Sequence, residues 1–242
     1  MKMRTRAVLP FLLFGVMLGA SCFAAAQSGA QTEKAETALS ASRPAKAASE
    51  ESQVPTVAYR LVFKGSTPEY VRIVVGKQGP ATYDIRQLSE PASPQPFQVS
   101  PALTEKIFSL AADLHDFNGI QLEARRRIAN LGQKTFSYTD GGQSYQVSFN
   151  YTLNAKANQL LDIFQSLSVE GQYLDQLHNS MRYDPLGLDD VLMRLQSDLA
   201  ARNVAEPKAL VPLLQQIVSN RQFLDVARQR AGQIIQSIDR TR

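Results

Sequence analysis

The sequence contains a single cysteine and few histidines, and both shortages restrict the chemistry available to the chain. Cys22 is the one cysteine among 242 residues, and the two histidines are His115 and His178. One cysteine cannot form an internal disulfide, and thiolate zinc sites need several such ligands. Stability must therefore come from a hydrophobic core, and the chain is long enough to bury one.

The sequence motifs of several enzyme classes are also absent. From residue 27 onward there is no Gly-x-Ser-x-Gly and no Ser-x-x-Lys, which present the nucleophile in serine hydrolases. The phosphate-binding loop and the dinucleotide Gly-x-Gly-x-x-Gly are missing as well. Asp113, His115 and Asp116 gather one imidazole and two carboxylates, which is short of a usual metal-ligand set. We therefore expect neither a metal nor a cofactor.

The first 26 residues have the three parts of a secretory signal peptide. Lys2, Arg4 and Arg6 provide positive charge, an uncharged apolar stretch follows, and three alanines precede Gln27. We predict cleavage between Ala26 and Gln27, and export to the periplasm or the extracellular space. Removal of this segment takes away three charges of the net +4, so the mature chain is nearly neutral. A nearly neutral exported chain predicts no nucleic-acid partner.

Cys22 leaves a second route of processing open. Residues 18–22 resemble a lipobox whose leucine stands one position too far upstream. Cleavage before Cys22 would produce a lipid-anchored protein, whereas cleavage after Ala26 would remove the cysteine. The expected membrane contact is therefore limited to the signal peptide or to a lipid on Cys22.

Composition divides the remaining chain into three parts. Residues 27–53 are rich in Ala, Ser, Glu, Gln and Lys, and too poor in large apolar side chains to offset the entropy of ordering. We predict a disordered linker there, an α+β domain over residues 54–167, and a helical C-terminal extension over residues 168–242.

Strand patterns open the predicted α+β domain. Residues 57–63, 70–75 and 82–88 alternate in polarity or are rich in β-branched and aromatic side chains, and short turns separate them. These three segments predict an antiparallel meander. Residues 135–139 and 145–152 flank an Asp-Gly-Gly turn and predict a β-hairpin.

Helix signals follow the meander and dominate after the hairpin. A proline-rich loop over residues 89–96 leads to Ser100 and Pro101, which begin a helix that we expect to end near Asp116. Further helices are expected over residues 155–167, 169–181, 185–199, 207–217 and 222–239, each with an apolar stripe. Strands first and helices afterwards predict an α+β fold, in which the last three helices form a small antiparallel array.

Gly65, Pro68 and Tyr70 stand at the spacing of a C-x-G-x-C-P-x-Y pattern, with Phe63 and Thr67 at its two cysteine positions. With the later Gly79 and Tyr83, residues 57–167 resemble an uncharacterised family of bacterial exported domains. The resemblance implies the order meander, helix, hairpin, helix, and it implies no activity. Residues 210–238 are similar to a HEAT-type helical pair, although one pair does not make a repeat array.

Arg125, Arg126 and Arg127, with Lys134 nearby in sequence, form the most concentrated charge in the chain. They are candidate contacts for an anion or an acidic partner, and a solvated surface is the alternative. Without catalytic motifs, we predict a non-enzymatic binding or interaction domain of the cell envelope, with another envelope protein as the candidate partner. Two alternatives stay open: a hydrolase that uses carboxylates from Asp113, Asp116, Asp189 or Asp190, and a lipid-anchored scaffold.

Overall fold

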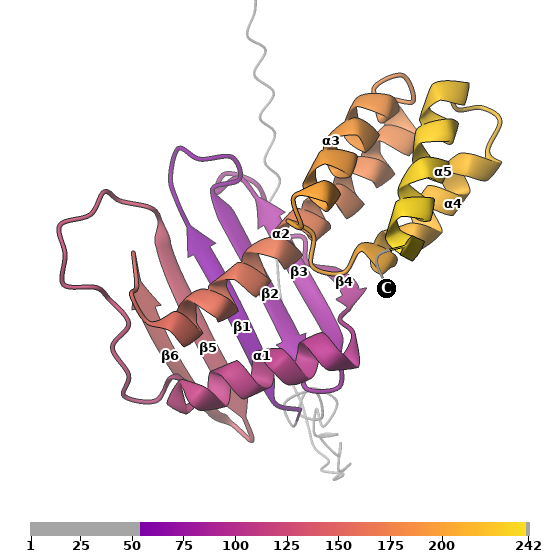
Figure 1. Cartoon of the computed structure of the whole chain (residues 1–242). Helices are drawn as coiled ribbons and strands as arrows, with labels where there is room; N and C mark the ends of the chain where they lie inside the picture. The colour runs from indigo at the N-terminus through magenta and orange to yellow at the C-terminus, as the bar shows by residue number, and fades with distance from the viewer. Residues whose placement is uncertain (1–53, 241–242) are drawn as a thin grey trace, which may run out of the picture. The chain divides into compact units, whose positions relative to one another are not determined.

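The computed structural model describes residues 54–240 (Figure 1). The predicted signal peptide with its cleavage site at Ala26 and Gln27, the candidate lipidation site Cys22 and the predicted linker all lie outside the described residues. Within the described part the fold is α+β, as the sequence predicts.

Six antiparallel strands form one sheet in the order β4-β3-β2-β1-β5-β6. The strands are β1 (Thr56–Val62), β2 (Tyr70–Gly76), β3 (Pro80–Arg86), β4 (Gln95–Gln98), β5 (Gln133–Asp140) and β6 (Gln143–Phe149). The predicted meander is β1–β3, and the predicted hairpin is β5–β6. Pairing of β1 with β5 joins the two into a continuous sheet.

Strand β4 corrects the sequence prediction, which assigned residues 89–96 to a loop. Gln95 and Pro96 begin this strand, and Pro96 stands opposite Thr82 of β3. Proline lacks an N–H and is tolerated at the edge of a sheet, which is where β4 lies. The prolines that indicated a loop are therefore compatible with a short edge strand.

Helix α1 (Pro101–Asp113) begins as predicted, because the Ser100 hydroxyl accepts a hydrogen bond from the backbone N–H of Leu103 at 3.3 Å. It ends at Asp113, three residues before the expected end. The 3₁₀ turn η1 (His115–Phe117) follows, and its three residues have φ of 55°, 52° and 65°. Such left-handed backbone is unfavourable for non-glycine residues, and burial of Phe117 holds it in place.

Helix α2 (Ala155–Tyr183) is one continuous helix of 29 residues where the sequence pattern predicts two. Its start is as expected, since the Asn154 side chain accepts hydrogen bonds from the N–H groups of Lys156 and Ala157. Ser168 and Gly171 lower the helix propensity near residue 168, where the sequence pattern predicts a break. Both residues are buried, and their tertiary packing stabilises a continuous helix.

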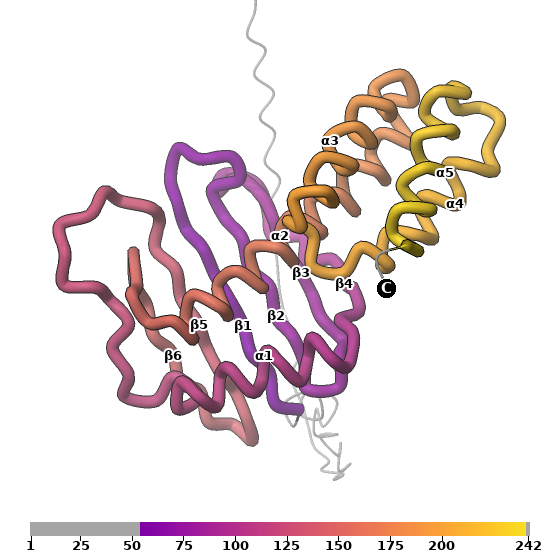
Figure 2. The backbone as a smooth tube through the Cα atoms, viewed as in Figure 1, coloured from indigo at the N-terminus to yellow at the C-terminus, as the bar shows by residue number. Residues whose placement is uncertain are grey.

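Three helices and a 3₁₀ turn complete the described part of the chain: α3 (Leu188–Ala200), η2 (Pro207–Leu210), α4 (Val211–Ser219) and α5 (Asp225–Arg240). Helix α5 packs against both α3 and α4, which gives the small array expected from the sequence (Figure 2). Among residues 54–240, no helix has the length and apolar character needed to cross a membrane.

Two hydrophobic cores share α2. The first lies between the sheet and the two helices α1 and α2, and its last fully buried residue is Leu167. The second lies among α2, α3, α4 and α5, and its first residue is Tyr173. The core therefore changes within α2, close to the domain boundary predicted between residues 167 and 168. We call residues 168–172 the seam of α2.

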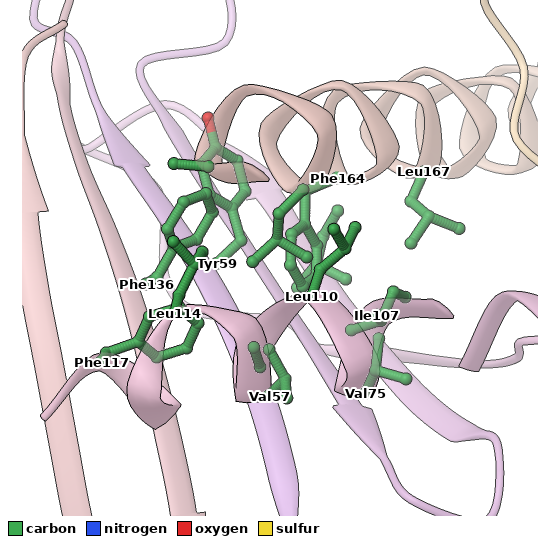
Figure 3. Close-up of a cluster of buried hydrophobic side chains, with 14 of the residues drawn as sticks. Val57, Tyr59, Val75, Ile107, Leu110, Leu114, Phe117, Phe136, Phe164 and Leu167 are labelled. Atoms are coloured by element: carbon green, nitrogen blue, oxygen red, sulfur yellow. The ribbon is translucent and has the colours of Figure 1, made fainter. Parts of the chain in front are cut away.

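Phe136 is fully buried in the first core, near Tyr59 and Phe117 (Figure 3). Its ring centroid is 5.9 Å from that of Tyr59, 5.5 Å from Phe117, 5.3 Å from Phe149 and 6.1 Å from Phe164. These rings come from β1, η1, β6 and α2, so one side chain connects the hairpin, the meander and a covering helix.

Candidate ligand-binding groove

A groove of about 680 Å³ lies between the β3–β4 region and α2. This volume is within the range of about 300–1,000 Å³ that is usual for small-molecule sites. Its lining is Tyr83, Asp84, Ile85, Arg86, Glu90, Pro91, Ser93, Gln95, Pro96, Leu174, Asp175, His178 and Asn179. Polar side chains from two distant parts of the sequence, residues 83–96 and 174–179, therefore line one cavity together with a few apolar side chains.

Gly171 allows α2 to pass close to β3. A Cβ atom at this position would lie 3.1 Å from side-chain atoms of both Tyr83 and Ile85, which is tighter than ordinary contact. One helical turn later, the carboxylate of Asp175 accepts a hydrogen bond of 2.8 Å from the Tyr83 hydroxyl. The missing side chain at Gly171 therefore brings the helix to the distance at which this hydrogen bond forms.

The contact between Asp175 and Tyr83 affects the pKa of both groups. The pKa of Asp175 is raised on balance, because burial is the largest cause and the Tyr83 hydrogen bond and the nearby His178 oppose it only in part. The pKa of Tyr83 is raised well above its usual range, by burial first and then by Asp175. Tyr83 therefore stays protonated, and its hydroxyl group is the hydrogen-bond donor to Asp175. His178 is exposed and lies three residues after Asp175, on the same side of α2.

Asp84 and Arg86 form the opposite wall. The Arg86 Nε atom is 3.1 Å from the Asp84 carboxylate, and Arg86 Nη1 donates to the backbone oxygen of Glu90 at 2.7 Å. The guanidinium also stacks on the Tyr70 ring, 4.4 Å from its centroid. Asp84 and Arg86 neutralise each other, so the carboxyl groups of Glu90 and Asp175 give the groove an acidic balance.

Glu170, in the seam of α2, is a fully buried carboxyl group next to Gly171. Its Oε2 atom accepts a hydrogen bond of 2.8 Å from the backbone N–H of Glu206, and its Oε1 atom has no partner. Glu206 in turn accepts a 2.7 Å bond from the backbone N–H of Ser100. Burial raises the pKa of Glu170 to about 8, so the group is largely protonated at neutral pH.

The structure separates the predicted charge cluster into two kinds of side chain. Arg125, Arg126 and Arg127 are exposed between η1 and β5, and none forms an ion pair within the described residues. Lys134 is buried, and its ammonium group donates to three backbone oxygens, those of Leu131, Gly132 and Asn150. The three arginines are thus available to a partner, whereas the lysine is engaged inside the protein.

The acids considered for a hydrolase do not line the groove. Asp113 pairs with Lys156 at 2.8 Å, and Asp189 pairs with Arg230 at 2.7 Å. His115 is exposed and is the first residue of the left-handed turn η1, and it does not line the groove that His178 lines. Over residues 54–240 there is no group of three His, Cys, Asp or Glu side chains suited to a metal ion.

No family model and no curated protein matches the chain. The resemblance to the bacterial exported domains therefore stays a prediction. Asp84, Arg86, Asp175 and Glu170 were not singled out from the sequence, since each is an ordinary residue in its own segment. One local signal existed: Glu170-Gly171 places an acid and a helix-weakening glycine among apolar residues of α2.

Proposed function

We propose that this chain is an exported, non-enzymatic binding protein whose groove between β3 and α2 takes a small organic cation of the amine type. One observation carries the proposal: the one arginine that lines this cavity of about 680 Å³ is paired with Asp84, while Glu90 and Asp175 form no salt bridge within residues 54–240. A primary ammonium can donate to these carboxylates and to the carbonyl of Asn179.

The walls of the groove support a preformed site. Tyr83 and Asp175 are joined by their hydrogen bond, and Arg86 holds Asp84 and the backbone of Glu90 in place. A site whose side chains are already fixed loses little entropy when a ligand binds. Export to the periplasm or cell surface, inferred from the N-terminal segment, would expose this groove to nutrients and signals outside the cytoplasm.

Two four-carbon probes of opposite charge test the proposal. We expect putrescine, a dication, to raise the melting temperature of the purified protein by about 5–10 °C when its concentration is one hundred times its Kd. Succinate, a dianion of the same chain length, should leave the melting temperature unchanged. Differential scanning calorimetry at matched ionic strength measures both shifts.

Replacing Asp175 by Asn keeps an acceptor for Tyr83 and removes the charge. We expect putrescine affinity to fall by about tenfold or more, because a charge-assisted hydrogen bond is lost. Asp162→Asn is the matched control, since Asp162 is an exposed acid on the same helix outside the groove. Equal shifts with putrescine and succinate, or equal losses in the two variants, would contradict the proposal.

A further inference from the structure

A second cavity, of about 460 Å³, lies among the C-terminal helices and shares no lining residue with the groove at β3. It is bounded by the end of α3, the α3–η2 connection, the start of η2 and the end of α5. Its lining residues are Gln196, Leu199, Ala200, Arg202, Val204, Pro207, Lys208, Ser237 and Ile238. This volume, too, is typical of a small-molecule site.

The interior of this cavity is mainly apolar. Leu199, Val204, Pro207 and Ile238 contribute aliphatic surface from α3, the α3–η2 connection, η2 and α5 respectively. Val204 and Ile238 also belong to the second core, so the cavity reaches down to the packed interior of the helical array. An aliphatic ligand placed there would remove apolar surface from water on both sides of the contact.

The charge around the cavity has one sign. Arg202 and Lys208 are the charged residues in its lining, and both side chains are exposed. Neither forms an ion pair within residues 54–240. No acid lines the cavity. An apolar interior with two unpaired cations beside it complements a ligand that has an alkyl chain and an anionic head.

Hydrogen bonds hold the connection that forms one wall. Arg202 has φ of 61°, and its backbone N–H donates to Leu199 at 3.1 Å. The side chain of Asn203 donates to Asp198 at 3.0 Å, and the N–H of Glu206 donates to Glu170, as described above. The wall is thus fixed at both ends, which lowers the entropic cost of binding.

We propose that this cavity is a binding site for a long-chain carboxylate, with the alkyl chain among Leu199, Val204 and Ile238 and the carboxylate between Arg202 and Lys208. The site is independent of the amine groove, because the two share no residue and carry opposite charge.

Isothermal titration of the purified protein with two amphiphiles that have dodecyl-length chains tests this site. Dodecanoate, kept below the concentration at which it forms micelles, is expected to bind with one-to-one stoichiometry. Dodecyltrimethylammonium has the same chain and the opposite charge, and we expect it to bind at least about tenfold more weakly. Equal affinity for the two amphiphiles would overturn the proposal, because it would show non-specific apolar contact.

Two pairs of variants locate the site. Ala200→Trp fills the cavity from an exposed position and should abolish dodecanoate binding, whereas Ala201→Trp, at the adjacent exposed position outside the lining, should leave it intact. Replacing Arg202 and Lys208 together by Gln should weaken binding by about tenfold or more. Replacing the exposed Lys106 and Arg221 by Gln removes the same charge elsewhere and should change little. Binding that survives Ala200→Trp would refute the assignment.

Discussion

Replacing Glu170 by Gln is expected to stabilise the protein at pH 8 and to leave its stability at pH 4.5 nearly unchanged. Glutamine retains an oxygen that can accept the hydrogen bond from the N–H of Glu206, and it cannot ionise. At pH 8 the variant therefore avoids a buried negative charge beside the carboxylate of Glu206.

The sign of this effect follows from proton binding. The pKa of Glu170 is about 8 in the folded protein, against an ordinary value of 4.5 that applies to the unfolded chain. Between these values the folded protein keeps a proton that the unfolded chain loses. The contribution of Glu170 to stability is thus fully present below pH 4.5 and is lost as the pH rises to about 8. Between pH 4.5 and pH 8, this difference in proton binding lowers the free energy of unfolding of the wild-type protein by about 3–5 kcal/mol.

Urea unfolding followed by circular dichroism, at pH 4.5 and at pH 8, measures this difference. Other carboxyl groups also titrate in this range, so the informative quantity is the difference between wild type and Glu170→Gln at each pH. Asp162→Asn, an exposed acid on the same helix, should follow the wild-type profile. Parallel profiles for wild type and Glu170→Gln would show that Glu170 is not buried as described.

Replacing Phe136 by Ala should reduce the free energy of unfolding by about 3–5 kcal/mol, which is the usual cost of removing a buried phenylalanine ring. Four other rings pack around this side chain, so the cavity cannot close by movement of one neighbour. The milder Phe136→Leu should lose less and provides a measurement if the alanine variant fails to fold.

Tyr183→Ala is the matched control for the core variant, because Tyr183 is 72% exposed at the end of α2. We expect its effect to stay within about 0.5 kcal/mol. Chemical denaturation of the three variants and wild type under one set of conditions gives the comparison. A loss below about 1 kcal/mol in Phe136→Ala would be inconsistent with burial of this ring among four others.

The features of the fold that were predictable are encoded locally. Alternating polarity indicated the meander and the hairpin, and Ser100 with Pro101 indicated where α1 begins. The pairing of β1 with β5 joins segments separated by about seventy residues, and no local pattern reports it. The continuity of α2 was also missed, because burial on two cores outweighs the low helix propensity of Ser168 and Gly171.

The groove was not predictable, because its residues become a site only through tertiary packing. In the sequence, Tyr83 is an ordinary strand residue and Asp175 an ordinary helix residue. They come into contact because Gly171, which has no side chain, allows β3 to pack closely against α2. The concentrated charge at Arg125 was conspicuous in the sequence for the opposite reason, since adjacent residues need no fold to be neighbours. In this protein the residues that stand out in the sequence, such as the arginines at 125–127, are therefore not the residues that form the groove.

Mapping of putrescine binding by NMR tests the central claim, that the groove between β3 and α2 binds a small cation. In ¹H–¹⁵N spectra of the uniformly labelled protein, we predict that putrescine shifts the backbone amides of residues 83–95 and 174–179, and that succinate does not. Shifts that saturate in this groove would support the site directly. Shifts centred elsewhere, or none at millimolar putrescine, would contradict the account.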